Sequence, residues 1–390
     1  MSSKTTCMSG AIFVAKAKKP EKVIYKAQAY DLLVSNSLPK PNFNAQTMKN
    51  KVLVKVKSAA INPVDTKFLP PFGPSKTLPV LRDFSGIVED ISENANNRDL
   101  KIGDAVMGMT EGLFGGACGQ YLVTDLSKIT RKPENVSFEK AAGLGVCYFT
   151  GYDGIFAETP AAKNQKRQPP NENSSILIIG SSGGTGMAGL QLAKNCAKAN
   201  LVVGVCSGKN ADFCRENGAD KIIDYTKSEE IDFKSLEILE MIKKNIELDD
   251  KFEGFDLIYD CVTSPEDFNY RDISTKYLLA PKGHYFCING TSGMWMKAMA
   301  TKATGLSWFM PKNQDLYIPS ATAEKMDQMS RWMEEGKLDI KLNSVYDFRT
   351  GKKVGEKGCE KIGDKICLNQ IVEEQCSRRA VGKIVVTNIN

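Results

Sequence analysis

A glycine-rich turn between a buried strand and a helix constrains the fold of this chain more than any other feature. Residues 176–179 form an unbroken apolar run, which is typical of a strand covered on both faces of a parallel sheet. The sequence GSSGGTG follows at 180–186, and helical spacing begins at Met187. Leu190 and Ala193 then share the face that turns back toward the sheet. The order predicts a strand, a tight turn and a helix.

This turn has the composition of a site for the pyrophosphate of a dinucleotide. Glycines let a turn close tightly and let the backbone approach an anion, while a helix N-terminus offers N–H groups and a partial positive charge. A tight turn without a ligand is the alternative. We expect the pyrophosphate to be held by Gly180, Ser182, Gly183, Gly184, Thr185 and Gly186.

The sequence before the glycine turn has a different pattern from the sequence after it. Before it, short strands such as Lys51–Lys57 alternate with glycine turns, which indicates a small barrel-like β domain. After it, strands alternate with helices, which predicts a doubly wound parallel sheet. We predict strands at 201–205, 221–223, 255–259 and 284–288, with helices at 210–217 and 265–279.

We therefore predict an α/β protein in which one domain is formed from two segments. The β domain occupies residues 1–150 and is completed by residues 319–390, with the cofactor domain at 151–318 between them. Two insertions interrupt the cofactor domain: a polar, proline-bearing stretch at 158–174 and a Met- and Trp-rich stretch at 291–311. We interpret the second as a buried or subunit-contact helix in preference to a membrane-surface helix, because it carries few charges.

Composition excludes several classes of function. The net charge is +6, but no basic stripe with interleaved aromatic residues accompanies it, so we expect no nucleic-acid partner. No run of about eighteen apolar residues predicts a transmembrane segment. The eleven cysteines contain no C-x-x-C pair, which favours free thiols in a reducing compartment, and we expect a cytoplasmic location.

Several motifs in a fixed order resemble the zinc-independent branch of the medium-chain dehydrogenase/reductase superfamily, the quinone oxidoreductase-like enzymes. The matching stretches are AINPVD at 60–65, DFSGIV at 83–88, GDAV at 103–106, AAGL at 141–144, the turn at 180–186, NGAD at 217–220, YDCV at 259–262 and GKIVV at 382–386. The resemblance implies a GroES-like catalytic domain around a Rossmann cofactor domain. It also implies hydride transfer to a quinone, enone or enoyl substrate between the two, and a homodimer through the edge of the cofactor sheet.

We expect no metal. A catalytic zinc needs three protein ligands, and the single histidine, His284, falls in a predicted buried strand. Where zinc-dependent relatives carry a ligand cysteine this chain has Asn62, and where they carry Gly-His-Glu it has Arg82-Asp83-Phe84. Polarisation of a substrate carbonyl must then come from hydrogen-bond donors or from the cofactor.

The resemblance places two residues beside the nicotinamide. Asn62 and Thr150 match family positions there and are our candidate catalytic residues. For Asn62, a turn residue before a proline is an almost equal alternative. Some enoyl-reducing relatives carry a tyrosine proton donor in a region where this chain has Phe68 and Phe72, which argues against an enoyl-thioester reductase.

The end of the second strand of the cofactor domain bears on the choice of cofactor. NAD enzymes place Asp or Glu there to bind the ribose hydroxyls, whereas residues 205–210 read VCSGKN and contain no acid. The hydroxyl of Ser207 and the ammonium of Lys209 suit a 2′-phosphate, so we favour NADPH. Tyr225 matches a family residue near the adenosine, with a surface tyrosine as the alternative.

The sequence therefore predicts an NADPH-dependent reductase of quinones or α,β-unsaturated carbonyl compounds. The alternative is a catalytically weak NADP(H)-binding scaffold or trafficking factor, acting at a membrane surface. The intact glycine turn is common to both hypotheses, so turnover distinguishes them.

Overall fold

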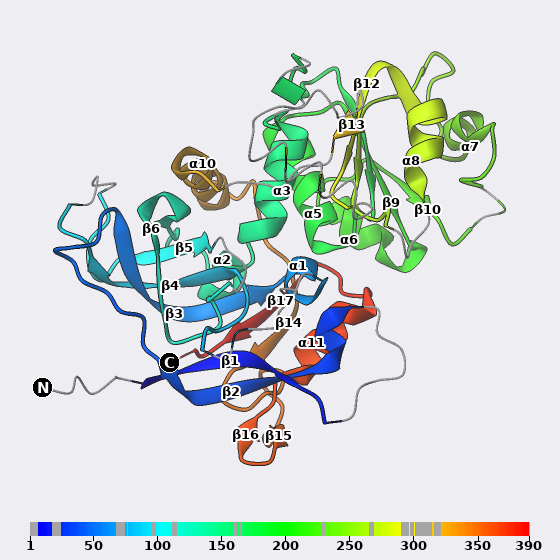
Figure 1. The fold of residues 1–390 in the computed structure, drawn as a ribbon. Coiled ribbons are helices and arrows are strands. Elements are labelled where there is room, and N and C mark those ends of the chain that lie inside the picture. Colours follow the sequence, from blue (N-terminus) through cyan, green and yellow to red (C-terminus); the bar gives the residue numbers. More distant parts are fainter. Residues whose placement is uncertain are drawn as a thin grey trace, which may run out of the picture. The chain divides into compact units, whose positions relative to one another are not determined.

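The chain forms two compact units in the computed structural model (Figure 1): Met1–Val146 with Ala321–Asn390, and Cys147–Ser320. The structure describes residues 7–17, 25–67, 75, 77–94, 99–110, 115–159, 162–163, 166–227, 229, 231–264, 269–289, 296, 300, 314–315 and 321–389. Most of the Met- and Trp-rich stretch at 291–311, and both Phe68 and Phe72, lie outside these residues.

The first unit is built on a seven-stranded sheet in the order β14-β17-β3-β4-β5-β7, with β6 also paired to β3. Its members are β3 (Lys51–Ile61), β4 (Asp83–Ile91), β5 (Ala105–Met109), β6 (Tyr121–Asp125), β7 (Ile129–Arg131), β14 (Leu342–Asp347) and β17 (Lys383–Thr387). Strand β17 runs antiparallel to the end of β3, with Val385 opposite Ala60. Residues from both ends of the sequence therefore complete one sheet.

Further elements surround this sheet. A ribbon of β1 (Cys7–Ala15) and β2 (Tyr30–Pro39) and a small hairpin of β15 (Lys361–Ile362) and β16 (Lys365–Ile366) belong to the unit. Its helices and short turns are η1 (Lys26–Ala29), α1 (Pro63–Lys67), η2 (Leu126–Lys128), α2 (Phe138–Ala142), α10 (Ala323–Glu334) and α11 (Asn369–Ser377). Leu368 and Ile371 at the start of α11 are fully buried in the main core, which joins this late segment to the sheet.

The second unit contains a six-stranded parallel sheet in the order β10-β9-β8-β11-β12-β13. Its strands are β8 (Ser175–Ile179), β9 (Leu201–Cys206), β10 (Lys221–Asp224), β11 (Phe255–Asp260), β12 (Leu279–Cys287) and β13 (Gln314–Asp315). The chain builds outward from β8 in one direction and continues from β11 in the other, which makes the β8/β11 boundary a topological switch point. The predicted doubly wound parallel sheet is confirmed.

Helices and turns precede or connect these strands. They are α3 (Gly145–Ile155), α5 (Gly184–Gln191) with its π-helical continuation η3 (Leu192–Cys196), η4 (Gly208–Asn210), α6 (Ala211–Glu216), α7 (Ile238–Asn245), α8 (Tyr270–Ile273) and η5 (Ser274–Leu278). In β8, residues 176–179 are all fully buried, as the apolar run predicted. Within the described ranges, the helices are too short or too polar to cross a bilayer.

The last predicted helix and strand of the cofactor domain differ from the structure. We predicted a helix through residue 279 and a strand from His284, but β12 already begins at Leu279. Leu279 pairs with Phe255, and the register then shifts so that His284 pairs with Leu257. The strand therefore starts before its apolar run. A register shift accommodates the residues between Leu279 and His284. The described part of the 158–174 stretch from residue 166 onward is largely exposed, as expected of a surface segment.

Candidate active site

The glycine turn after β8 needs glycine at two positions for two different reasons. Gly180 has φ +76°, in the left-handed region that side chains disfavour. At Gly186, a Cβ atom would lie 2.2 Å from the carbonyl oxygen of Gly180 and 2.6 Å from the Cα of Ser181. The N–H groups of Gly180 and Ser181 both donate to the carbonyl of Val205, at 3.0 and 3.1 Å. The turn is thereby tied to β9, with α5 held close above it.

The glycine turn is accessible where α5 begins. Gly183 is the N-cap residue in an extended conformation, and a Cβ atom there would meet only the carbonyl of Gly180, at 3.6 Å. Residues 182–185 are partly exposed, and the side-chain amide of Asn210 donates to Ser182 Oγ at 3.1 Å. The first N–H groups of a helix have no carbonyl one turn earlier to bond, so α5 offers donors to an anion.

The remaining predicted cofactor residues gather at the same edge of the sheet. Because β8, β9 and β10 are adjacent and parallel, their carboxyl ends lie together. Ser207 follows β9 and is partly exposed, whereas Lys209 is exposed. The N–H of Tyr225, after β10, donates to the carbonyl of Cys206 at 3.2 Å, and its side chain is half exposed. The structure therefore brings these three side chains to the edge that carries the glycine turn.

Asp224, the last residue of β10, lies against this edge and was not identified from the sequence. Its carboxylate accepts hydrogen bonds from the backbone and hydroxyl of Thr226, at 3.0 and 2.7 Å. A Cβ atom at Gly208 would stand 2.3 Å from Asp224 Oδ2. Burial opposes its ionisation, but the hydrogen bonds from Thr226 and from the Gly208 backbone lower the pKa of the Asp224 carboxyl. The sequence has no acid at the end of β9, and the neighbouring strand β10 supplies one.

Thr150 lies on α3, a helix that packs against the glycine-turn helix α5. One turn earlier, Cys147 Sγ lies 3.5 Å from Thr185 Oγ1. A Cβ atom on Gly151 would meet Leu192 at 2.9 Å and Ala188 at 3.5 Å, so the two helices approach closely there. Thr150 itself is buried. The structure thus brings Thr150 and the turn into one unit, and its role beside the nicotinamide stays a prediction.

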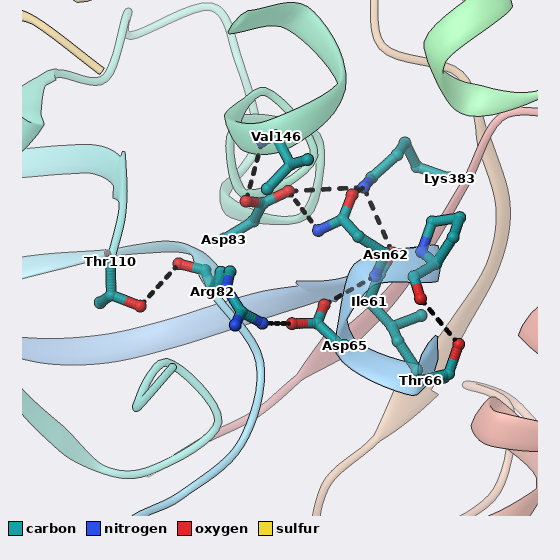
Figure 2. Close-up of polar contacts among 10 residues, drawn as sticks. Ile61, Asn62, Asp65, Thr66, Arg82, Asp83, Thr110, Val146 and Lys383 are labelled. Carbon is teal, nitrogen blue, oxygen red and sulfur yellow. Dashed lines mark hydrogen bonds and ion pairs between the residues drawn. The ribbon is translucent and has the colours of Figure 1, made fainter. Parts of the chain in front are cut away.

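Asn62 belongs to the other unit and lies in a buried polar cluster (Figure 2). Its side-chain Nδ2 donates to Asp83 Oδ2 at 2.8 Å, and Lys383 Nζ donates to Asn62 Oδ1 at 2.6 Å. The same ammonium reaches the carbonyl of Ile61 at 3.2 Å and Asp83 Oδ2 at 3.4 Å. The other oxygen of Asp83 accepts from the N–H of Val146 at 2.9 Å. The cluster joins β3, β4, β17 and the start of α3.

A second ion pair adjoins this cluster through the backbone of Asn62. The N–H of Asn62 donates to Asp65 Oδ2 at 2.9 Å, and Arg82 Nη1 pairs with Asp65 Oδ1 at 2.5 Å. Burial raises the pKa of the Asp83 carboxyl, and the attraction of Lys383 and the hydrogen bonds from Asn62 and Val146 oppose that effect. Two acids and two bases therefore lie within one buried network, which keeps its charge balanced.

Comparison with known proteins places this fold in a family. The alcohol dehydrogenase GroES-like domain model matches residues 48–168, and the zinc-binding dehydrogenase model matches residues 217–353. Protein YIM1-2 of Lachancea thermotolerans is 30% identical over 362 residues, which cover 86% of this chain and 93% of that relative. The chain belongs to the medium-chain dehydrogenase/reductase superfamily. Its members are oxidoreductases that use nicotinamide cofactors, so the predicted enzyme class is confirmed.

Two further comparisons are with reductases. The trans-enoyl reductase fsa3 of a Fusarium species is 32% identical over 181 residues, which cover 45% of this chain and 50% of that relative. The quinone oxidoreductase of Coxiella burnetii superposes with a TM-score of 0.67 at 19% identity, over 98% of this chain and 99% of that one. The predicted combination of a GroES-like domain with a Rossmann domain is confirmed.

One family model is described as zinc-binding, but the residues around Asn62 do not fit a zinc ion. Structural and catalytic zinc sites use cysteine, histidine and carboxylate ligands. Here the Asn62 amide oxygen and an Asp83 oxygen both contact the ammonium of Lys383. Nowhere in the described ranges do three or more His, Cys, Asp or Glu side chains gather as metal ligands would. His284 is buried in β12, and burial, with the nearby charge of Arg167, lowers its pKa to about 3.

Proposed function

We propose that this chain is an NADPH-dependent reductase of quinones or α,β-unsaturated carbonyl compounds that works without zinc. The observation that carries the proposal is the open glycine turn after β8, with Ser207 and Lys209 at the end of the adjacent β9. The trans-enoyl reductase and quinone oxidoreductase relatives support the substrate class, because both names describe reduction of a conjugated or quinonoid acceptor.

The residues of the second unit fit a dinucleotide phosphate. Gly180 supplies the left-handed turn, Gly186 the close approach of α5, and Gly183 the open surface that a pyrophosphate needs. In this proposal Ser182, Gly184 and Thr185 complete the pyrophosphate site, Ser207 and Lys209 bind the 2′-phosphate, and Tyr225 lies beside the adenosine.

The charge of Asp224 bears on which residue would determine the preference for NADPH over NADH. Its carboxylate lies against Gly208, between Ser207 and Lys209, and is held there by Thr226. A negative charge at this place repels a 2′-phosphate, so preference for NADPH must come from the ammonium of Lys209. We therefore expect Lys209 to be the main determinant of that preference.

The bound nicotinamide supplies a hydride, and the protein positions the acceptor and excludes water. Asn62 and Thr150 are the side chains proposed to lie beside the nicotinamide and the acceptor. The amide of Asn62 is held in one orientation by the ion pair around it, which suits a residue that must present a fixed surface to a ligand. Water supplies the proton that completes the reduction.

The test is a fluorescence titration with NADPH and with NADH, followed by addition of 9,10-phenanthrenequinone. We expect NADPH to bind more tightly than NADH and to be oxidised when the quinone is added. Lys209→Ala should weaken NADPH binding by about 10- to 100-fold and leave NADH binding nearly unchanged. Lys221→Ala is the matched control, because Lys221 begins β10 and so lies at the amino end of the strands, away from the carboxyl ends that carry Ser207 and Lys209. Failure to bind either nucleotide would contradict the proposal.

A second hypothesis, an NADP(H)-binding scaffold or trafficking factor with little turnover, predicts binding without oxidation in the same titration. The observation in its favour is the Asn62 cluster, in which polar side chains bond to one another within one unit. NADPH binding that survives, together with no oxidation by quinones, enones or enoyl compounds, would favour this scaffold.

We also propose a cytoplasmic location and a homodimer. The eleven cysteines, all of which lie in the described ranges, form no disulfide, which suits a reducing compartment. Among the described residues, the short strand β13 (Gln314–Asp315) is the last strand of the cofactor sheet, and pairing through this edge would join two copies. Light scattering behind size-exclusion chromatography tests the assembly, and a mass equal to one chain would exclude the dimer.

A further inference from the structure

Lys383 is a buried cation in direct contact with the Asn62 side chain. It begins β17 and is 2% exposed. Its ammonium donates to Asn62 Oδ1, reaches the carbonyl oxygen of Ile61 and lies near Asp83 Oδ2. A lysine ammonium has three N–H donors and no acceptor, and its burial is tolerated when oxygen partners receive those donors.

Asp83 is fixed as firmly on the other side of the amide. Its Oδ1 accepts from the N–H of Val146, and its Oδ2 accepts from Asn62 Nδ2. A Cβ atom on Gly145 would lie 2.1 Å from Asp83 Oδ1, so glycine at this position leaves the space that the carboxylate occupies. The carboxylate therefore has a defined place that its neighbours in β3, β4 and α3 maintain.

Together these two charges decide which way the amide of Asn62 points. An asparagine side chain has nearly the same shape when its oxygen and nitrogen are exchanged, so packing alone distinguishes the two orientations poorly. An ammonium only donates and must face the amide oxygen, while a carboxylate only accepts and must face the amide nitrogen. With Lys383 on one side and Asp83 on the other, only one orientation satisfies both partners.

We propose that Lys383 and Asp83 are positioning residues that lock the Asn62 amide in the orientation that the reduction requires. The amide orientation follows from the cluster itself, whereas its consequence for turnover rests on the proposed function. A residue on β17 thereby controls a residue that follows β3, across 321 positions of sequence. The pair therefore sets the direction of the amide, and a pair with a different arrangement of donors and acceptors should change that direction.

The decisive variant removes both charges. Lys383→Met alone leaves the carboxylate of Asp83 buried without its cation, so loss of activity would be mixed with loss of stability. Lys383→Met combined with Asp83→Asn removes the unpaired charge and keeps the size of both side chains. The N–H of Val146 needs an oxygen acceptor, so the carboxamide introduced at position 83 turns its NH2 group toward Asn62 and favours the reversed orientation of that amide. The double variant should therefore regain most of the melting temperature lost in Lys383→Met.

Turnover should separate the positioning role from a structural one. In the double variant we expect kcat to remain about tenfold or more below that of the parent enzyme, with the KM for NADPH changed less than about twofold. Lys341→Met is the control, because Lys341 also lies in the first unit but pairs with Asp339 at 2.6 Å on the surface. Lys341→Met should leave both kcat and melting temperature near the parent values.

NMR of the Asn62 side-chain amide tests the positioning role independently of activity. In protein labelled with 15N-asparagine, the side-chain amide signals of Asn62, assigned through Asn62→Ser, should be a single slowly exchanging pair in the parent. In the double variant the pair should move to different chemical shifts, because the reversed orientation of the Asn62 amide is then favoured. Unchanged signals and an unchanged kcat in a stable double variant would overturn the inference. A parent enzyme that oxidises no NADPH would instead contradict the proposed function, while the amide signals would still decide the positioning.

Discussion

The glycine turn of the second unit and the Asn62 cluster of the first treat polar groups in opposite ways. The turn leaves residues 182–185 partly exposed, and its helix offers N–H groups to a ligand. The cluster buries Asn62, Asp83 and Lys383 almost completely and satisfies them internally. The turn, where a ligand would bind and dissociate, is accessible. The Asn62 amide, which we propose must keep one orientation, is enclosed by a cation and an anion.

The largest expected effect is on the ion pair that adjoins the Asn62 cluster. Arg82→Met removes the cation that pairs with the buried carboxylate of Asp65, whose side chain is 1% exposed. Breaking such a pair by removing one partner should lower the unfolding free energy by about 4 kcal/mol. Chemical denaturation measures the loss, and NADPH affinity should change little because the glycine turn is in the other unit. A loss no larger than that of an exposed pair such as Lys140–Asp339 would show that the Arg82–Asp65 pair does not hold the first unit together.

The turn should respond to an added methyl group at one glycine and tolerate it at another. Gly186→Ala places a Cβ atom 2.2 Å from the carbonyl oxygen of Gly180, so we expect a loss of about 3 kcal/mol in unfolding free energy. NADPH affinity should fall with it. Gly183→Ala is the matched variant, because its Cβ meets nothing nearer than 3.6 Å and its φ of −75° is ordinary. Equal destabilisation by both variants would contradict this account of the turn.

Acid should weaken the second unit through its histidine. The pKa of His284 is lowered from 6.5 to about 3, so the folded form stays neutral where the unfolded form takes up a proton. The contribution of the neutral His284 to the unfolding free energy is therefore fully present above about pH 6.5 and is lost as the pH falls below that value. Between pH 7 and pH 5 the loss should be about 2 kcal/mol.

This pH effect can be assigned because the chain has one histidine. His284→Phe should remove the corresponding part of the pH dependence of the unfolding free energy. The imidazole signal of the folded protein should not titrate between pH 7 and pH 5. A midpoint near 6.5 in the folded protein would exclude the buried, neutral histidine.

The smallest expected effect concerns cofactor preference. Asp224→Asn removes a negative charge beside Ser207 and Lys209 but keeps an oxygen that can accept from Thr226. NADPH should then bind about fivefold more tightly, and NADH affinity should change less. Asp212→Asn, on the exposed face of α6, is the control. Weaker NADPH binding in Asp224→Asn would show that the carboxylate serves the loop more than it repels the phosphate.

The two regions also differ in how far the sequence could predict them. The turn lies within residues 180–186, so strand, glycines and helix could be read from one short stretch, and the parallel sheet followed from it. Asn62 was identified through the family resemblance, but its partners were not, because Asp83 and Lys383 are 21 and 321 residues away. Asp224 was missed for a related reason: only the order of strands shows that the end of β10 lies against the loop after β9.

The pairing of β17 with β3 also sets the order in which the chain can mature on the ribosome. Ser58 to Ile61 of β3 are hydrogen-bonded to β17, and Lys383 follows Ile61 by 322 residues. At about 5–20 residues per second, translation needs roughly half a minute to supply that strand. Until then the nascent first unit has an open strand edge in the middle of its sheet, although the whole sequence of the second unit has already been made. Newly synthesised chains therefore depend on protection of that edge against pairing with other chains.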